Sequence, residues 1–278
     1  MKEDNFVALY NQGYNLRKLG RYEEAIECFD KALKINSKGV DALNDKGTVL
    51  VILGKYKEAI KCCEQVLDID PTFSNAWFTK GNALAKLNNH EEAIKCYDQL
   101  SKIEIYDSFV WHNKGVTLFK LRKYEEAIKY YDLVIQIKHN DPRVWYYKGV
   151  ALVRIRKYQD ALTCYDESIK LKPNDSDVWL NKGIVLDYQD KTREALYAYD
   201  RAIRVNPGNS SAWYNKGSAL AELGQYQEAI ACYDETIKIK PRYANAWREK
   251  GDALVALGRY DEARECFTIS ERIRKDEY

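Results

Sequence analysis

Apolar residues recur along this chain at the spacing of α-helices, in segments joined by short turns. Residues 210–243 show the pattern clearly. Trp213, Gly217 and Leu220 are separated by four and three positions, so they lie on one helical face. A Leu-Gly step at residues 223–224 follows, and glycine readily adopts the left-handed conformation found at helix ends. We therefore predict a first helix that ends before this glycine.

A second apolar face follows after the turn. From about residue 227 to residue 238, Ala229, Tyr233 and Ile237 are spaced by four, which is again the spacing of one helical face. Pro241 comes next, and proline both lacks a backbone N–H and disfavours helix in the residue before it. This part of the chain therefore predicts a pair of helices joined by a tight turn.

The same two-helix pattern is repeated along the whole chain. A glycine recurs at one constant interval, at Gly13, Gly47, Gly81, Gly115, Gly149, Gly183, Gly217 and Gly251. Self-similarity at such a period is typical of a helical solenoid, in which each unit buries its apolar face against its neighbours. We predict one elongated domain over residues 1–278, with the repeats 6–39, 40–73, 74–107, 108–141, 142–175, 176–209, 210–243 and 244–277.

The repeated glycine lies in the middle of the first helix, where it costs about 1 kcal/mol relative to alanine. Close packing is the simplest compensation. The glycine at position 8 of each repeat and the alanine at position 20, such as Gly217 and Ala229, would let two antiparallel helices approach near their backbones. The tryptophan at position 4 then fills the space beside them. We expect this Trp-Gly-Leu face to form the core.

The order Trp, Gly, Leu, Tyr, Ala, Tyr or Phe, and Pro over 34 residues resembles the tetratricopeptide repeat, and the resemblance covers essentially the whole chain. It implies an all-α fold, a right-handed superhelical solenoid of sixteen helices in antiparallel pairs. One departure is lysine at position 7 of seven repeats, where the family often has leucine. Repeat six also departs at its turn, where Gln189, Asp190 and Thr192 replace the Leu, Gly and Tyr of other repeats.

The charge of the chain is nearly balanced, with 44 Lys and Arg against 42 Asp and Glu and a net charge of +2. Proteins that bind nucleic acid or membrane surfaces electrostatically carry a strong basic bias, so we expect neither partner. The first residues lack the apolar region of a signal peptide, and no apolar run approaches the roughly 18 residues that span a bilayer. We therefore expect a cytoplasmic protein.

The cysteines follow the repeat. Six of the seven occupy the same position in six repeats, and Cys63 lies one residue further along. Equivalent positions in neighbouring repeats are separated by helix layers of about 8–10 Å, which is beyond disulfide reach, and no Cys-x-x-Cys pair occurs. We predict small core residues in a reducing compartment rather than a disulfide or metal framework.

A second face of the first helices, at positions 5, 9 and 12, is rotated by about 100° from the core face. In repeats three to six this face is apolar and aromatic. It is either additional core or a partner-binding surface. We favour binding, because the Trp-Gly-Leu face already supplies the core and an uncovered apolar patch usually marks an interaction site. The resemblance implies that this face, with positions 2, 6 and 13, lines a concave groove that holds partner peptides.

The candidate binding residues lie at these positions of repeats three to six. They are Phe78, Asn82, Phe109, His112, Asn113, Val116, Phe119, Lys120, Arg143, Tyr146, Tyr147, Val150, Arg154, Leu180, Asn181, Ile184 and Tyr188. Cations such as Lys86 and Lys120 beside the apolar side chains suit a ligand with apolar anchors and acidic residues, although a solvated charged surface explains them equally. Asparagine at position 6 offers a donor and an acceptor to an extended peptide backbone.

The chain contains no recognisable catalytic motif. Its three histidines occupy unrelated positions, which argues against a shared metal site, and neither a phosphate-binding loop nor a nucleophile elbow occurs. We predict a non-enzymatic interaction scaffold, without cofactor or metal, that binds a partner protein or peptide. Two alternatives stay open: self-association into a homo-oligomer, and a role as the non-catalytic subunit of an enzyme complex.

Overall fold

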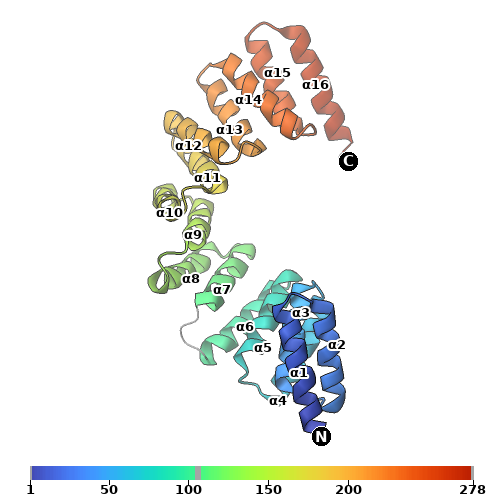
Figure 1. The fold of residues 1–278 in the computed structure, drawn as a ribbon. Helices are drawn as coiled ribbons and strands as arrows, with labels where there is room; N and C mark the ends of the chain where they lie inside the picture. Colours follow the sequence, from blue (N-terminus) through green and yellow to red (C-terminus); the bar gives the residue numbers. More distant parts are fainter. Residues whose placement is uncertain (1, 104–107, 277–278) are drawn as a thin grey trace. The chain divides into compact units, whose positions relative to one another are not determined.

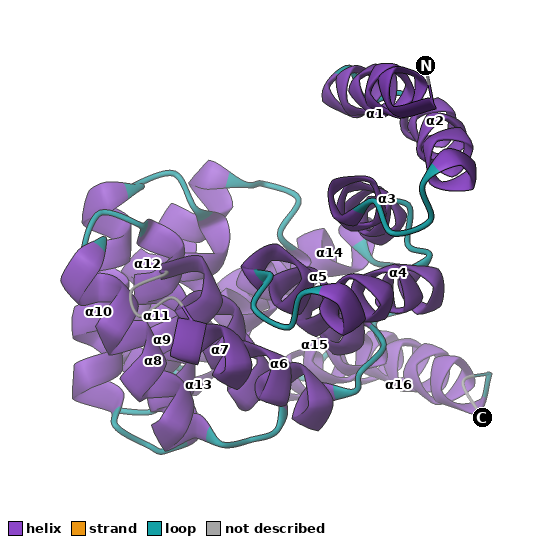
Figure 2. Cartoon of the chain, turned by 90° about the horizontal axis from the view of Figure 1, so that it is seen from below, coloured by secondary structure: helices purple, strands orange, loops and turns teal. Residues whose placement is uncertain are grey.

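The computed structural model of the chain describes residues 2–103 and 108–276. Within these residues the chain forms sixteen α-helices and no strand (Figures 1 and 2). It divides into two compact units, Met1–His139 and Asn140–Tyr278, called unit 1 and unit 2 below. The predicted all-α class is confirmed, whereas the prediction of one domain over the whole chain is not tested by this division.

Unit 1 contains eight of the helices, in four consecutive pairs. Their bounds are α1 Lys2–Lys18, α2 Tyr22–Ile35, α3 Val40–Ile52, α4 Tyr56–Ile69, α5 Ser74–Lys86, α6 His90–Ile103, α7 Ser108–Lys120 and α8 Tyr124–Ile137. After α1, the first helix of each pair begins at the first residue of a sequence repeat. Short turns join the two helices of each pair, so the helices of a pair run antiparallel.

Unit 2 contains the other eight helices described in the structure, arranged in the same way. Their bounds are α9 Pro142–Arg154, α10 Tyr158–Leu171, α11 Ser176–Asp187, α12 Thr192–Val205, α13 Ser210–Glu222, α14 Tyr226–Ile239, α15 Ala244–Ala256 and α16 Tyr260–Lys275. The predicted second helix of residues 227–238 is thus one residue longer at each end. None of the described helices is long and apolar enough to cross a membrane.

Each unit has one layer of first helices and one layer of second helices. In unit 1, α3 contacts both α1 and α5, and α5 contacts α7; α9, α11, α13 and α15 form the same series in unit 2. Among the described residues, the second helices of neighbouring pairs make no such contact with each other. The first helices therefore pack more closely, and we call their side turned away from the second helices the inner face of each unit.

The repeated glycine makes room for an aromatic ring, which corrects the packing expected from the sequence. A Cβ atom on Gly149 would lie 2.6 Å from Cε1 of Tyr165, and one on Gly81 would lie 2.7 Å from Cε1 of Tyr97. Real Cβ atoms do not approach carbon so closely. The ring at position 24, and not only the alanine at position 20, is what excludes a side chain at position 8. These tyrosines are fully buried at the centre of each helix pair.

The lysine at position 7 pairs with an acidic residue at position 25 of the preceding repeat. The Nζ–carboxylate distances are 2.5 Å for Lys46 and Asp30, and 2.6 Å for Lys216 and Asp200. Four more pairs repeat the arrangement: Lys80–Glu64, Lys114–Asp98, Lys182–Asp166 and Lys250–Asp234. The departure from the family's leucine therefore links each of these repeats to the one before it.

The tryptophan at position 4 also joins neighbouring repeats. Trp77 Nε1 donates a hydrogen bond to the Pro71 carbonyl oxygen at 2.9 Å, and Trp213 Nε1 donates to that of Pro207 at 3.0 Å. The lysine at position 7 lies over the tryptophan ring, with Nζ of Lys216 5.8 Å from the ring centre of Trp213. A single proline thus ends one repeat and accepts a hydrogen bond from the next.

All seven cysteines are buried, as the sequence predicts. Burial raises the pKa of the Cys63 thiol to about 12 and that of the Cys96 thiol to about 11. A thiol with a raised pKa stays protonated at neutral pH and is a poor nucleophile. The cysteines therefore act as small core residues.

Candidate functional site: the inner face of each unit

The residues predicted to bind a partner lie on first helices or, for Tyr188, directly after one, and none of them is buried. In unit 1 they come from α5 and α7, and in unit 2 they come from α9, α11 and the residue that follows α11. Phe109 and Tyr188 are the most open large side chains among them, each 59% exposed. Most of the stripe is half-buried, and Phe78 also packs against a core cluster of unit 1, so the binding surface stays a prediction.

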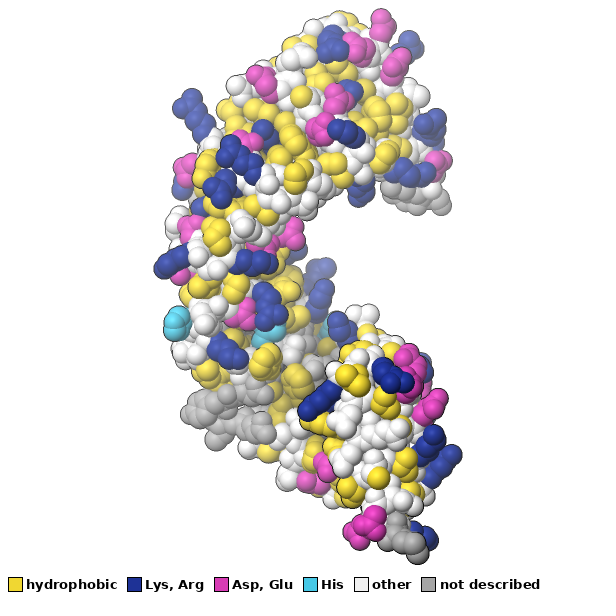
Figure 3. All heavy atoms as spheres, in the orientation of Figure 1, with side chains coloured by type: hydrophobic (Ala, Val, Ile, Leu, Met, Phe, Trp, Pro, Cys, Tyr) yellow, Lys and Arg dark blue, Asp and Glu magenta, His cyan; other side chains and the backbone are white. Residues whose placement is uncertain are grey.

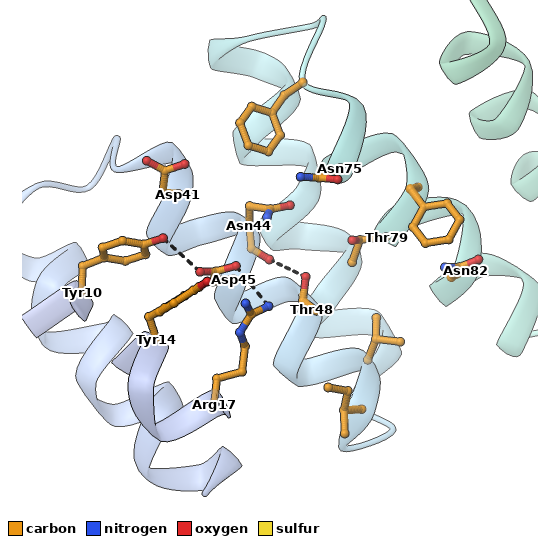
Figure 4. A pocket seen from close by; sticks show the side chains of 14 residues that line it. Tyr10, Tyr14, Arg17, Asp41, Asn44, Asp45, Thr48, Asn75, Thr79 and Asn82 are labelled. Carbon is orange, nitrogen blue, oxygen red and sulfur yellow. Dashed lines mark hydrogen bonds and ion pairs between the residues drawn. The ribbon is translucent and has the colours of Figure 1, made fainter. Parts of the chain in front are cut away.

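The inner face of unit 1 contains a hollow of about 490 Å³, which we call the Asp45 hollow (Figure 4). Helices α1, α3 and α5 supply its walls. Its lining residues are Tyr10, Tyr14, Arg17, Asp41, Asn44, Asp45, Thr48, Val51, Ile52, Phe73, Asn75, Phe78, Thr79 and Asn82. Figure 4 shows the side chains of Tyr10 and Arg17 directed from α1 toward Asp45 on α3.

Asp45 is the buried carboxylate of this hollow. The Tyr10 hydroxyl donates a hydrogen bond to Asp45 Oδ2 at 3.1 Å, and Arg17 Nη1 lies 3.4 Å from Asp45 Oδ1. Burial raises the pKa of Asp45, and the Arg17 guanidinium opposes this shift. Burial, together with the nearby Asp45 charge, raises the pKa of Tyr10 to about 12. The hollow is therefore a negatively charged site in which Tyr10 stays protonated at neutral pH.

A second hollow of about 480 Å³ adjoins the first, because Val51 and Asn82 line both. We call it the Lys86 hollow. Its other lining residues are Ala85, Lys86, Asn88, His90, Tyr97, Asn113, Val116, Thr117 and Lys120. Two lysines and no carboxylate occur in this lining, so the Lys86 hollow has the opposite charge to the Asp45 hollow.

Four of the predicted residues of unit 1 meet in the Lys86 hollow: Asn82, Asn113, Val116 and Lys120. Tyr97 holds Asn82 in place, because its hydroxyl donates to Asn82 Oδ1 at 2.8 Å. Phe119 is instead packed edge-on against Tyr124, with ring centres 5.2 Å apart. The structure thus brings together Asn82, Asn113, Val116 and Lys120, whereas Phe119 is not among the lining residues of this hollow.

Tyrosines dominate the inner face of unit 2. Asn181 Nδ2 donates to the Tyr146 hydroxyl at 3.3 Å and to the Asp177 carbonyl oxygen at 2.8 Å. The rings of Tyr146 and Tyr147 have centres 5.5 Å apart. Arg143 pairs with Asp141 at 2.9 Å, at the start of its own helix. Among the predicted residues of unit 2, Tyr146, Tyr147 and Asn181 therefore form one contiguous group.

Several lining residues of the Asp45 hollow were missed by sequence reasoning. Tyr10, Tyr14, Asp41, Asn44 and Asp45 belong to repeats one and two, which lack the apolar stripe used to select candidates. Their positions within the repeat, 2, 5, 6 and 9, are nevertheless those at which candidates were chosen in repeats three to six. Applying these positions to every repeat, whatever the side chain, would have found them.

The fold defines a class of protein: an all-α repeat protein whose neighbouring helix pairs are joined by contacts that recur from repeat to repeat. Models of one family, the tetratricopeptide repeat, match most of the chain. The matched residues are 6–38, 40–73, 62–95, 108–141, 142–175, 180–244 and 219–274. The chain belongs to the tetratricopeptide repeat family.

Solved structures of this family resemble the chain at low sequence identity. The C-terminal part of a TPR repeat-containing protein from Cytophaga hutchinsonii is 22% identical, with a TM-score of 0.73 over 86% of this chain and 98% of that one. YrrB, described as a TPR protein with an unusual peptide-binding site, is 20% identical, with a TM-score of 0.61 over 69% and 98%.

MamA from Desulfovibrio magneticus RS-1 is 24% identical to the chain, with a TM-score of 0.57 over 61% of this chain and 96% of that one. The search of curated proteins found no match. At these identities the solved structures establish the fold alone. They agree with the predicted solenoid of antiparallel helix pairs.

Proposed function

We propose that this protein is a non-enzymatic scaffold that holds an extended segment of another protein along the inner face of its first helices. The observation that carries the proposal is the pair of adjoining hollows in unit 1. Together they form a depression of the size in which protein sites usually hold side chains of a ligand. They also combine aromatic walls with a few polar groups, which suits peptide binding.

The chemistry of the Lys86 hollow supports an acidic residue in the partner segment. Lys86 and Lys120 are exposed at its rim, and its lining contains no carboxylate. The amides of Asn82 and Asn113 lie in the same lining and are able to bond a peptide backbone or a carboxylate. Val116 and the Phe78 ring of the adjoining hollow supply apolar contacts. The ligand predicted from the sequence, with apolar anchors and acidic residues, matches this lining.

The inner face of unit 2 forms a second part of the proposal. Its half-buried and exposed side chains, with Tyr146, Tyr147 and Asn181 in contact, offer aromatic surface and amide groups. YrrB, which shares the fold, is described as having a peptide-binding site, and this supports a peptide as the class of partner. The seven buried cysteines support a reducing compartment, so we place the protein in the cytoplasm.

Selection from a displayed random peptide library on the full chain tests the proposal. We expect the selected peptides to bind at least about tenfold more weakly to Val116→Asp, because an aspartate there would offset the charge of the lysines in the Lys86 hollow and repel an acidic residue of the peptide. The control is Leu19→Asp, which makes the same kind of change at a side chain that is 73% exposed in a turn of unit 1. The control variant should bind like the natural chain.

Two results would overturn the proposal. One is that the full chain retains no peptide above background. The other is that Val116→Asp and Leu19→Asp bind the selected peptides equally well, which would place the site away from this inner face. Light scattering over a range of protein concentrations, done on the same samples, separates peptide binding from the alternative of self-association.

A further inference from the structure

The lining of the Asp45 hollow contains more carboxylates than cations. Its charged lining residues are Asp41, Asp45 and Arg17, so two carboxylates accompany one guanidinium. Arg17 pairs with Asp45. The exposed Asp41 carboxylate has no hydrogen bond or ion pair with the part of the chain that the structure describes. The lining of the hollow therefore has a net negative charge, with Lys18 outside the lining but over the Tyr14 ring.

The side-chain oxygen of Asn44, in the same hollow, is a second and independent observation: it is a buried acceptor that lacks a hydrogen-bond donor among the described residues. Asn44 is only 8% exposed, and its Oδ1 atom has no hydrogen-bond partner among the described residues. Buried side-chain acceptors are nearly always hydrogen-bonded, and leaving one unpaired is costly. Figure 4 shows the Asn44 side chain on the wall of the hollow, in view between Asp41 and Asn75. Because the Oδ1 atom itself is buried, a small rotation of the amide toward the hollow would let a ligand N–H satisfy it.

The walls of the hollow also suit a flat cation. The Arg17 guanidinium lies 5.0 Å from the ring centre of Tyr14, and Lys18 Nζ lies 4.5 Å from the same centre. The Phe78 ring lines the hollow from α5. Aromatic faces attract cations, and a guanidinium both stacks on rings and donates several hydrogen bonds in one plane. Arg17 shows within the chain how a guanidinium is held between a ring and a carboxylate here.

We propose that the Asp45 hollow binds an arginine side chain of the partner segment, with its guanidinium against Asp41 and Asn44 and between aromatic walls. This inference rests on the proposed function and makes it more specific. Because the Asp45 and Lys86 hollows share Val51 and Asn82, the partner segment carries an arginine and an acidic residue in neighbouring hollows. Arginine fits better than lysine, since its planar donors reach a carboxylate and an amide oxygen together.

A titration of the full chain with single amino-acid probes tests the site directly. The probes are N-acetyl-arginine amide and N-acetyl-citrulline amide, which has nearly the same shape but no charge. We expect the arginine probe to shift the NMR signals of the Asn44 side-chain amide and of α3 backbone amides near it. The citrulline probe should bind at least about tenfold more weakly. Equal binding of the two probes, or shifts confined to other helices, would overturn the proposal.

Two substitutions with opposite expected effects sharpen the test. Asp41→Asn removes a charge at an exposed position, so the fold should be unaffected, and binding of the arginine probe should fall by up to about fivefold. Arg17→Gln removes the internal guanidinium and leaves Asp45 to the probe, so binding should strengthen by a similar factor. If neither variant changes the affinity, the hollow is not the arginine site. An N-acetyl-lysine amide probe that binds as tightly as the arginine probe would overturn the choice of arginine.

The peptide selection described above separates this inference from the proposed function. Peptides enriched in arginine for the natural chain, but not for Asp41→Asn, would support both. Peptides that are retained without arginine enrichment would overturn the inference and leave the interaction scaffold in place. If the arginine probe binds and no peptide is retained, the arginine site stands and the peptide-binding function is wrong.

Discussion

Units 1 and 2 share one frame and differ on their inner faces. In both units, position-7 lysines pair with acidic residues of the preceding repeat, and position-4 tryptophans donate to proline carbonyl oxygens. In both, a glycine leaves room for a buried tyrosine. On the face shown in Figure 3, basic and acidic side chains are interspersed in each unit. The frame is therefore set by residues that recur, and it says nothing of what each unit binds.

The inner faces carry the difference. Position 5 is Tyr10, Asn44, Phe78 and His112 in unit 1 and Tyr146, Leu180, Tyr214 and Arg248 in unit 2. In unit 1, Tyr10, Asn44 and Phe78 line the negatively charged Asp45 hollow. In unit 2 these positions carry tyrosines in contact with neighbouring side chains, as between Tyr214 and Tyr243, whose ring centres are 5.0 Å apart. Residues that vary between repeats are thus the ones to test for function.

The largest expected effect comes from replacing a position-8 glycine, which packs against a buried ring in both units. Gly149→Ala should destabilise unit 2 by up to about 2 kcal/mol, because overpacking costs about 1–3 kcal/mol and helix propensity returns about 1 kcal/mol. The added Cβ would lie 2.6 Å from the Tyr165 ring, and this tyrosine is buried and has no room to move. Urea unfolding followed by circular dichroism measures the change.

Repeat two provides the matched control for this substitution. Its ring position holds Cys63, and a Cβ on Gly47 would lie 3.4 Å from the Cys63 sulfur, which is an ordinary contact. Gly47→Ala should therefore stabilise unit 1 by up to about 1 kcal/mol, since only the helix propensity and the backbone entropy change. Equal destabilisation by both substitutions would contradict the role given to the aromatic ring.

Most of this frame could be predicted from the sequence, because its residues recur at one interval. That constant interval predicted the helix pairs, and the observed first helices after α1 begin at the predicted repeat starts. The role of the position-7 lysine could not be predicted. Its partner lies on the second helix of the preceding repeat, as Asp200 does for Lys216, and helical periodicity within one helix does not relate two residues on different helices.

The candidate site was less predictable for a physical reason. An apolar stripe indicates a surface only where apolar residues are unexpectedly exposed, so polar binding residues leave no such signal. Asn44 and Asp45 look like ordinary helix-surface residues in the sequence, yet both are buried. What makes them distinctive is the unpaired Asn44 oxygen and the packing of α1 and α5 beside α3, which only the three-dimensional arrangement provides.

A smaller effect tests whether the turns that join paired helices contribute equally to the stability of the two units. Arg122 in unit 1 and Arg156 in unit 2 lie in the turns that follow α7 and α9, in the left-handed region, with φ of 61° and 60°. In other repeats a glycine occupies the same place in the turn: Gly20, Gly54, Gly224 and Gly258. The left-handed conformation costs a residue with a side chain about 1–2 kcal/mol. Glycine avoids this cost, but it makes the unfolded chain more flexible, which offsets part of the gain in stability. Arg122→Gly and Arg156→Gly should each stabilise the protein by about 0.5–1 kcal/mol.

Both arginines are exposed, so the gain should come from the backbone alone. Urea unfolding of the two single variants and of the double variant measures it. Additive gains of similar size would show that the turns of the two units are equivalent. A gain in one unit only would mean that the frames differ, and a loss in both would contradict the strain assigned to these turns.

Each inner face also holds an aspartate that accepts a hydrogen bond from a tyrosine hydroxyl. Asp45 is buried and Asp187 is half-buried, and they differ in whether a cation lies beside the carboxylate. Asp45 in unit 1 has Arg17 as well as Tyr10. Asp187 in unit 2 accepts from Tyr199 at 2.5 Å, and its Oδ1 atom has no hydrogen-bond partner among the described residues. Burial raises the pKa of both carboxyls, and for Asp187 no cation opposes the shift.

The smallest expected effect follows from the raised pKa of Asp187. An acid whose pKa is higher in the folded protein stabilises the fold below its ordinary value of 3.8 and loses that contribution as the pH rises through the folded value. The natural chain should therefore lose stability relative to Asp187→Asn as the pH is raised from below 3.8 toward neutral. Urea unfolding of both proteins at several pH values measures this difference. A stability difference that does not depend on pH would contradict the raised pKa. Arg17→Gln should raise the pKa of Asp45 further, because it removes the charge that opposes the effect of burial.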